Sequence, residues 1–552
     1  MSSFLRFAVE QVLTNKANEL KEYVIGVEVF RRNQGYDTRL DPVVRVEARR
    51  LRSKLATYYE TEGKQDEIVI EFPKGSYVPV FHGRGESKSG AGTDTPTVAV
   101  LPFANLSAEP EHAYFSDGLT QELIHLLTKL RGLRVLAWNS SVHLSASADP
   151  RDIGREFHVN TVLTGSVRRT RDRVRITAQF VETATGFSLW SESYDRDMQD
   201  LFVIQEEIAS AIVSALRSRL IPAKQPELRR SAQNIDAYNL YLRGRFYWNE
   251  RTSQGLKRSI QLYKEALAID PTFAMAYAGL ADSYSIMAEY SVVHPSEALP
   301  LARTAAQQAL ALDPDLGEAE TSLGLIRALY DWEWADAERH FRRAIVLNPS
   351  HVTAHHWYAI DFLAVCGRMD EADEHIRIAR ELDPFSPLIL EGVGFMYLLR
   401  RQYDQAIREY RELMHLDGYF YKGYTAMGRA YIQLGQYDNA MVMLEKGRSL
   451  AGDIPNILGA MGQAAAYSGD AERAHELLQE LHAMSEERYV SLTTLALVHL
   501  ALGERDCAFA CLKQSVERHD LPVTGLKTHP AYDPLRNDPR FHELLVQLRF
   551  ED

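Results

Sequence analysis

Two groups of side chains offer the atoms that catalysis or metal binding needs. Ser116 and Asp117 lie close to His112, but residues this near in one loop rarely form a catalytic triad, so we interpret them as helix-capping residues. Cys507 and Cys511 stand four residues apart and offer half of a metal site. Because no second Cys or His pair stands at ligand spacing nearby, the cysteines are interpreted as buried helix packing.

The adjacent pair His355 and His356 is a third candidate, but side chains one residue apart on a helix point in different directions. The sequence also contains none of the patterns G-x-x-x-x-G-K-[ST], G-x-G-x-x-G after a strand, H-E-x-x-H and G-x-S-x-G. We therefore expect no catalytic residue, no cofactor and no metal ligand, and predict that the protein is not an enzyme.

A row of arginines is the stronger candidate for binding chemistry. A helix is expected from Asp41-Pro42, where Asp41 can cap and Pro42 fits the first turn, to about Gly63. Spacings of 4, 3, 4 and 3 residues put one set of apolar side chains on a single buried face: Val44, Ala48, Leu51, Leu55 and Tyr58. Three arginines fall on another face, in water: Arg45, Arg49 and Arg52.

The elements around this helix complete a recognisable order. Helical periodicity covers residues 4–14 and 20–30, and two alternating runs, "DEIVIEF" and "SYVPVF", are joined by a turn containing Lys74. Residues 1–82 thus resemble the winged-helix DNA-binding domain of OmpR-type transcriptional regulators, although the strands that precede the first helix in that family are missing. The resemblance implies that Arg45, Arg49 and Arg52 bind double-stranded DNA in the major groove or at phosphates, and that Lys74 contacts the backbone.

The alternative for the same arginines is a solvated face. In that case they pair with Glu47, Glu60 and Glu62, and the first domain mediates protein contacts. The charge of this part of the chain is a weak guide, because residues 1–84 hold 14 Lys or Arg against 12 Asp or Glu in a chain of net charge -13.

A flexible linker is expected at residues 83–96, since "HGRGESKSGAGTDTP" is polar and lacks apolar periodicity. Residues 97–222 then alternate strands and helices, ending in three strands within 159–196 and a long helix at about 199–220. These features predict a layered α/β domain. Two stretches, "AVLPFANLSAEPEHAYFSDGLTQELIHLLTKL" and "LTGSVRRTRDRVRITAQFVETATGFSLWSESYDR", resemble the TolB-N-terminal-like region of bacterial signalling proteins. That resemblance implies no defined chemistry.

The rest of the chain is repetitive. Alanines recur at intervals of 35, 35, 34, 34, 34 and 34 residues: Ala302, Ala337, Ala372, Ala406, Ala440, Ala474 and Ala508. Asp-Pro or Asn-Pro follows each of the first three by twelve residues, which ends a helix. A second series of small residues lets the two helices of each repeat approach: Gly324, Ala359, Gly394, Gly428, Gly462 and Ala496.

Segments such as "AYAGLADSY" and "TAMGRAYIQLGQYDNAM" resemble the tetratricopeptide repeat (TPR) family over about residues 237–520. The resemblance implies a superhelix of about eight helical hairpins whose concave groove binds a protein or peptide. Residues 521–552 are expected to cap the last hairpin.

Three cysteines cannot form a disulfide framework for 552 residues, and no apolar run reaches the length of a membrane span. We therefore expect a cytoplasmic protein with no membrane partner, which could form homo-oligomers. The predicted fold class is multidomain α and α+β: a winged-helix-like domain, an α/β layered domain and a C-terminal α-solenoid. The predicted function is a bacterial-type TPR-containing transcriptional regulator, and the alternative is a scaffold in a signalling complex that does not bind DNA.

Overall fold

The computed structural model describes residues 2–13, 22–32, 43–60, 63, 66, 68–72, 78–83, 96–106, 113–128, 130, 133–144, 148–169, 173–197 and 234–550. The chain divides into two units, Met1–Thr95 and Pro96–Asp552. The expected helix at 199–220 lies outside the described residues, as does most of the expected linker.

The described residues of the first unit form three helices followed by two paired strands, in the order that the periodicity predicts. The helices are α1 (Ser2–Leu13), α2 (Glu22–Glu28) and α3 (Val43–Glu60), and the strands are β1 (Ile68–Glu71) and β2 (Val80–Gly83). β1 and β2 pair antiparallel with Ile68 opposite Gly83. The core is formed by Phe4, Ala8, Ile25, Val44, Ala48, Leu51 and Phe72.

The buried face of α3 is confirmed at Val44, Ala48 and Leu51, and Leu55 is partly buried. The prediction for Tyr58 is wrong, because its side chain is 40% exposed. Tyr58 instead packs edge-on against Tyr59, with ring centroids 5.2 Å apart. Among the described residues, Gly63 lies against the Tyr58 ring, where an added Cβ atom would be 2.4 Å from it.

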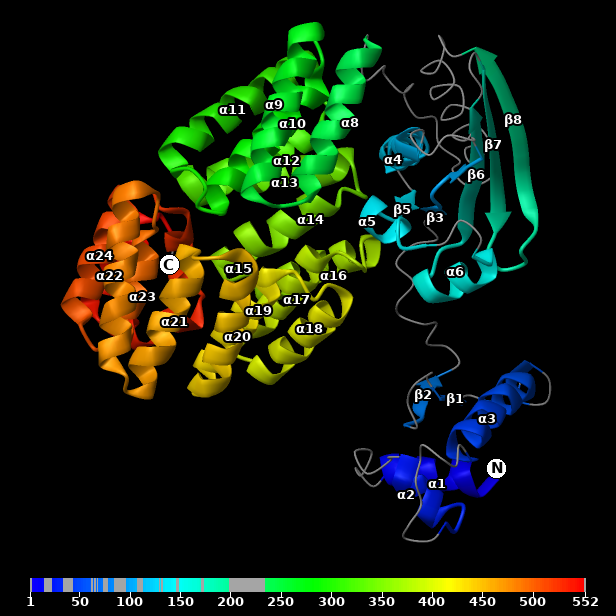
Figure 1. Ribbon diagram of the computed structural model, residues 1–552. Coiled ribbons are helices and arrows are strands. Elements are labelled where there is room, and N and C mark those ends of the chain that lie inside the picture. The colour runs from blue at the N-terminus through cyan, green and yellow to red at the C-terminus, as the bar shows by residue number, and fades with distance from the viewer. Residues whose placement is uncertain are drawn as a thin grey trace. The chain divides into compact units, whose positions relative to one another are not determined.

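The second unit begins with a mixed sheet in the order β5-β3-β6-β7-β8, with β4 beside β6 (Figure 1). Its strands are β3 (Thr97–Val100), β4 (Ala104–Asn105), β5 (Arg134–Val135), β6 (Thr161–Arg169), β7 (Arg173–Glu182) and β8 (Ser188–Asp197). The three long strands predicted between residues 159 and 196 are present and pair antiparallel, whereas β3 is parallel to both β5 and β6. The helices of this part are α4 (Ala113–Thr128), α5 (Trp138–Ser141) and α6 (Pro150–Phe157).

Eight helical hairpins follow within residues 235–517, and each of the last seven buries the recurring alanine that was predicted to lie between its helices. The hairpins are α8 (Ile235–Asn249) with α9 (Ser253–Ile269), α10 (Ala274–Glu289) with α11 (Pro295–Leu312), α12 (Gly317–Ile326) with α13 (Trp334–Leu347), α14 (Val352–Trp357) and α15 (Ala364–Cys366) with α16 (Met369–Leu382), α17 (Pro387–Leu399) with α18 (Tyr403–Leu416), α19 (Tyr421–Gln433) with α20 (Tyr437–Ala451), α21 (Pro455–Ser468) with α22 (Ala471–Glu487), and α23 (Leu492–Ala501) with α24 (Arg505–Glu517). This region resembles a TPR solenoid.

Close helix packing explains the second series of small residues. A Cβ atom on Gly394 would lie 2.3 Å from the ring of the buried Tyr410, and one on Gly428 would lie 2.7 Å from Leu444. Any larger residue at either position would therefore push the paired helices apart. Two π-helical turns, η4 (Arg327–Asp331) and η5 (Tyr358–Leu363), widen the first helices of the third and fourth hairpins.

The C-terminal segment does more than cover the last hairpin. It forms two 3₁₀ turns, η6 (Leu521–Lys527) and η7 (Pro530–Leu535), and the helix α25 (Pro539–Gln547). Its apolar side chains pack on α23 and α24, as expected of a cap, but also on Trp332 of the third hairpin. The Trp334 Nε1–H donates to the carbonyl of Leu548 at 3.0 Å, so the segment joins hairpins that are far apart in the sequence.

Candidate functional site

The N-terminal arginines fall mostly outside what the structure describes. The backbone of α3 is described, but the side chains of Arg45, Arg49 and Arg52 are not, and Lys74 lies outside the described residues altogether. Their DNA contacts therefore stay a prediction. On the same helix the exposed Arg50 pairs with Glu47 at 2.7 Å, so one carboxylate named in the solvated-face alternative is engaged by a neighbouring arginine.

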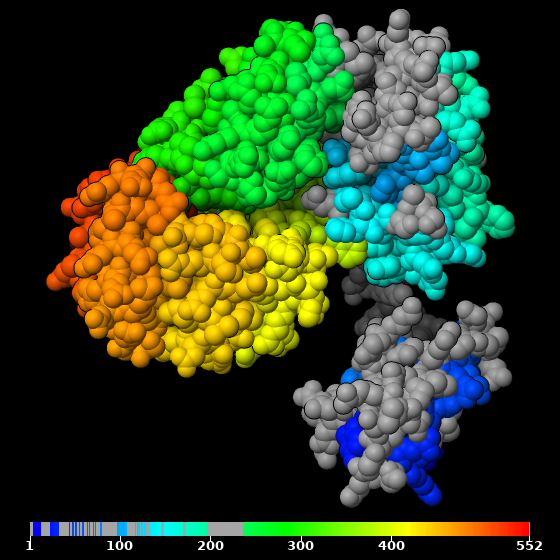
Figure 2. Space-filling model, in the orientation of Figure 1, coloured from blue at the N-terminus to red at the C-terminus, as the bar shows by residue number. Residues whose placement is uncertain are grey.

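The inner face of the hairpin array contains a cavity of about 350 Å³. Its walls come from α8, α12, α14 and the turns before α14, α17 and α19, and from α4 and α5 of the α/β domain. Figure 2 shows the region where these green, yellow and cyan segments meet. Two guanidinium groups lie against the indole ring of Trp248, Arg251 at 3.6 Å and Arg245 at 4.4 Å from its centroid. Such cation–π stacking holds charge beside an apolar wall.

Asp282, the ion-pair partner of Arg245, is a buried carboxylate. Asp282 accepts a hydrogen bond from the Ser322 hydroxyl at 2.7 Å and lies 3.4 Å from the Arg245 guanidinium. Burial raises the pKa of Asp282 from its ordinary value of 3.8 to about 6, against the opposing effects of Arg245 and Ser322. A 3.4 Å ion pair is too long to offset the desolvation of the charge.

This shift predicts a pH dependence of stability. A carboxylic acid with a raised folded-state pKa stabilises the fold fully below about pH 3.8, and that contribution is lost as the pH rises through about 6. Relative to the wild type, Asp282→Asn should therefore gain on the order of 2 kcal/mol in free energy of unfolding between pH 4 and pH 7. Denaturant titrations of both proteins across this range measure it, with the exposed Asp315→Asn as control. A constant difference between the two proteins would contradict the expectation.

A second cavity of about 350 Å³ lies further along the inner face, and the C-terminal segment forms part of its wall. The Lys422 ammonium lies 3.1 Å from the centroid of the Tyr290 ring. Asp361 and Glu391 also line the cavity, and burial raises the pKa of both carboxyl groups. The groove that a TPR array would offer to a peptide is thus partly filled here by the chain's own Leu521, His529 and Tyr532 among others.

The α/β domain is attached to the array by buried hydrogen bonds. The Ser140 hydroxyl donates to the Asp383 carboxylate at 2.6 Å, and the Ala137 N–H donates to the Leu382 carbonyl at 2.7 Å. One hairpin earlier, the Ser350 hydroxyl donates to the Leu133 carbonyl at 3.1 Å. The Asn-Pro and Asp-Pro turns, predicted only to end helices, therefore also hold the α/β domain. No local pattern in the sequence indicated that second role.

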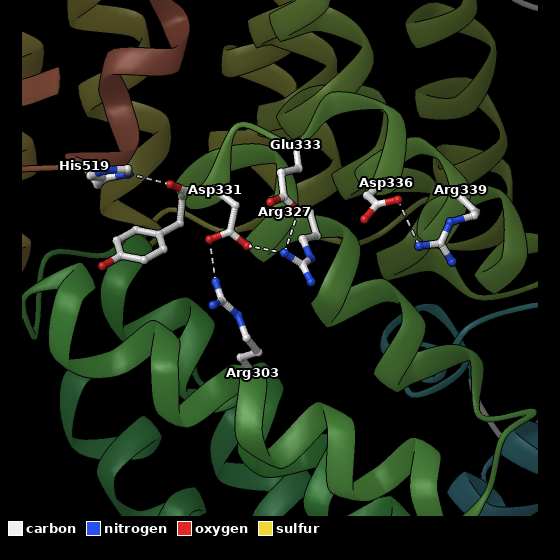
Figure 3. A network of polar contacts seen from close by, with 8 residues as sticks. Arg303, Arg327, Asp331, Glu333, Asp336, Arg339 and His519 are labelled. Carbon is white, nitrogen blue, oxygen red and sulfur yellow. Dashed lines mark hydrogen bonds and ion pairs between the residues drawn. The ribbon is translucent and has the colours of Figure 1, made fainter. Parts of the chain in front are cut away.

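An ion-pair network marks the π-helical turn of the third hairpin (Figure 3). Asp331 accepts from Arg303 of α11 at 2.5 Å and from Arg327 at 3.2 Å, and Arg327 also contacts Glu333 at 2.5 Å. The His519 ring contacts the Tyr330 carbonyl at 2.7 Å, Nδ1 to O. These contacts link the second hairpin, the third hairpin and the turn between α24 and the C-terminal segment, so we assign the network a structural role.

Two of the three groups considered first for chemistry, those at Ser116 and Cys507, have different surroundings from those predicted. Ser116 is buried inside α4, which begins at Ala113, so it does not cap that helix. His355 contacts His375 at 2.9 Å, Nδ1 to Nδ1, and burial lowers the pKa of His355 and His356 to about 3. Cys507 is exposed, so the prediction that both cysteines are buried packing is wrong.

Within the described residues, no helix combines the length and the apolar character that crossing a membrane requires.

Residues 93–211 match the family model described as HilA/YgeH-like transcriptional regulator, second domain. The chain therefore contains a domain like that of these regulators. Among individual proteins, it is 42% identical over 192 residues to "Putative adenylate cyclase 3" of Rhizobium meliloti (strain 1021), covering 34% of this chain and 32% of that protein. It is 23% identical over 332 residues to "Transcriptional regulator HilA" of Salmonella typhimurium, covering 57% and 58%. The chain thus spans less than two thirds of both relatives.

Among solved structures, a tetratricopeptide repeat protein from Parabacteroides merdae aligns with 49% of this chain and all of its own, at 16% identity and a TM-score of 0.35.

One sequence prediction is overturned by these similarities. The absence of the commonest catalytic patterns led to the prediction that the protein is not an enzyme, yet the relative that is 42% identical over a third of the chain carries the name "Putative adenylate cyclase 3". Catalytic residues that are spread along a chain leave no short sequence signature, so the absence of those patterns does not exclude an enzyme.

Proposed function

We propose that this protein is a transcriptional regulator that binds double-stranded DNA through its first unit and a protein or peptide partner through its hairpin array. The observation that carries the proposal is the order of elements in residues 2–83. A helix with a buried apolar face, α3, is followed by the antiparallel hairpin β1–β2. By helical geometry, positions 45, 49 and 52 lie on a different side of α3 from Val44, Ala48 and Leu51.

The similarity to the Salmonella regulator supports the same proposal, because it extends over 57% of this chain. The proposed roles are those that the winged-helix resemblance implies. Arg45, Arg49 and Arg52 contact base edges or phosphates in the major groove, and Lys74 contacts the sugar–phosphate backbone.

The proposed partner site is the inner face of the array beside the α/β domain. There the cavity at Trp248 is walled by both domains, and ligand sites favour such junctions. The Ser140–Asp383 contact gives a partner bound there a direct connection to the α/β domain.

The test is binding of the full chain to a labelled duplex from its own upstream region, measured by fluorescence anisotropy at two salt concentrations. A regulator should bind, and its affinity should fall steeply with salt because phosphate contacts release counterions. Absence of salt-dependent duplex binding would contradict the proposal and favour the scaffold alternative.

A second candidate function, formation of cyclic AMP from ATP, rests on the 42% identity to the Rhizobium meliloti protein. The assay incubates the full chain with ATP and Mg²⁺ or Mn²⁺ and measures cyclic AMP by mass spectrometry. Product that increases with protein concentration supports this candidate, and no product with either metal ion counts against it.

A further inference from the structure

Three metal-ligating side chains converge where the seventh hairpin meets the eighth, and His475 lies beside one of them. His499 lies near the end of α23, Glu504 directly precedes α24, and Cys507 lies in the first turn of α24. One ligand atom from each of these three residues lies within 4.8 Å of the other two. His475, from α22, brings its Nε2 to 3.2 Å from Glu504 Oε1.

His475 has an acceptor at each ring nitrogen, and these two acceptors, the Ala471 carbonyl first and Glu504 second, raise the pKa of the ring. Its Nδ1 lies 2.7 Å from the Ala471 carbonyl oxygen, and its Nε2 faces the Glu504 carboxylate. Both neighbours are acceptors, but a neutral imidazole has only one N–H. A second proton on Nε2 satisfies the Glu504 carboxylate when the ring is charged. When the ring is neutral and Nδ1–H donates to Ala471, a metal ion at Nε2 would take the place of that proton.

We propose that His475, His499, Glu504 and Cys507 form a Zn²⁺ site. A set of two imidazoles, one carboxylate and one thiolate suits zinc, whereas Mg²⁺ and Ca²⁺ prefer oxygen ligands alone. Tetrahedral zinc would place these donors about 3.3–3.6 Å apart. The 2.6 Å contact between His499 Nδ1 and Glu504 Oε2 must then open slightly, and His475, which meets the other carboxylate oxygen, Oε1, must move toward the ion. The thiol of Cys507 must lose its proton to solvent on binding.

Several contacts prepare the ligands for this role. The Ala471 carbonyl fixes the His475 ring through Nδ1, as outer partners of zinc-bound histidines do, and leaves Nε2 for the metal. Glu504 and Cys507 are three residues apart at the start of one helix, so they share a side of it. The site would tie α22 to α23 and α24, next to the point where the C-terminal segment packs on the eighth hairpin.

The alternative is a zinc-free cluster in which Glu504 simply accepts hydrogen bonds from both imidazoles. The sequence reasoning paired Cys507 with Cys511 and so missed the site, because His475 and His499 lie on other helices. No spacing pattern links residues 475, 499, 504 and 507.

The test uses the full chain, stripped with a chelator and titrated with Zn²⁺ by calorimetry and with Co²⁺ by absorbance. One ion per chain should bind, and Co²⁺ should give a thiolate charge-transfer band. Cys507→Ser should abolish the band and weaken Zn²⁺ binding by on the order of 100-fold, since changes to outer partners alone cost 10–100-fold. Cys511→Ser, one turn further along α24, is the matched control and should keep both the Co²⁺ charge-transfer band and the wild-type affinity for Zn²⁺.

Because Cys507 is exposed, its replacement should leave the fold intact, and circular dichroism checks this. His475→Asn and Glu504→Gln should each weaken Zn²⁺ binding as well. A band that survives in Cys507→Ser, one ion per two chains, or no Zn²⁺ binding at micromolar concentrations would each overturn the proposal.

Discussion

Replacing Arg45, Arg49 and Arg52 together with alanine should lower the affinity of the full chain for duplex DNA by at least about 100-fold, because each contact contributes on the order of 1–3 kcal/mol. The slope of log affinity against log salt should also fall by up to about 3, since each phosphate contact releases roughly one counterion. Fluorescence anisotropy at four salt concentrations measures both quantities.

The matched control removes the same number of charges elsewhere. Arg339, Arg342 and Arg343 are exposed on α13, so their triple alanine variant should bind DNA as the wild type does. Equal losses in both variants would mean that only net charge matters, and no loss in either would remove α3 from the proposed interface. Under the scaffold alternative, neither variant changes duplex affinity.

Asp520→Ala should lower the free energy of unfolding of the array by about 4 kcal/mol, because several buried donors lose their hydrogen-bond acceptor at once. The Asp520 side chain is 1% exposed and accepts hydrogen bonds from the Tyr489 hydroxyl at 2.8 Å and the Leu492 N–H at 2.7 Å. It also accepts from Ser515 at 3.0 Å and from Ser491 at 3.2 Å. This carboxylate fixes the chain just where the C-terminal segment leaves the eighth hairpin.

Urea unfolding followed by tryptophan fluorescence gives the free energy of unfolding. Hydrogen–deuterium exchange of residues 521–550 shows whether the loss of stability is located in the C-terminal segment. Exchange in that segment should accelerate. The control is Asp506→Ala on the same hairpin, where an exposed carboxylate pairs with Arg540, so stability should change by less than about 1 kcal/mol. A loss under about 1 kcal/mol for Asp520→Ala would show that the donors find other acceptors.

The repeat architecture and the strand pairing could be predicted from sequence because both depend on local periodicity. The alanines from Ala302 to Ala508, 34 or 35 residues apart, are buried because two helices pack against each other in every repeat. Each hairpin needs a small residue at that contact. Alternation along β7 likewise gives a buried face at Val174, Ile176 and Ala178. The same reasoning identified α3 and its buried residues, with the exception of Tyr58.

Only the tertiary structure decided which distant segments meet. The rotation from one hairpin to the next accumulates along the array, and this curvature, which no short window of sequence contains, brings Trp332 and Trp334 against residues 519–550. The turns at Ser350 and Asp383 likewise contact the α/β domain through buried hydrogen bonds, although they are far from it in the sequence. Packing of the seventh hairpin on the eighth brings His475 to 3.2 Å from Glu504, because residues on separate helices meet only after those helices have packed.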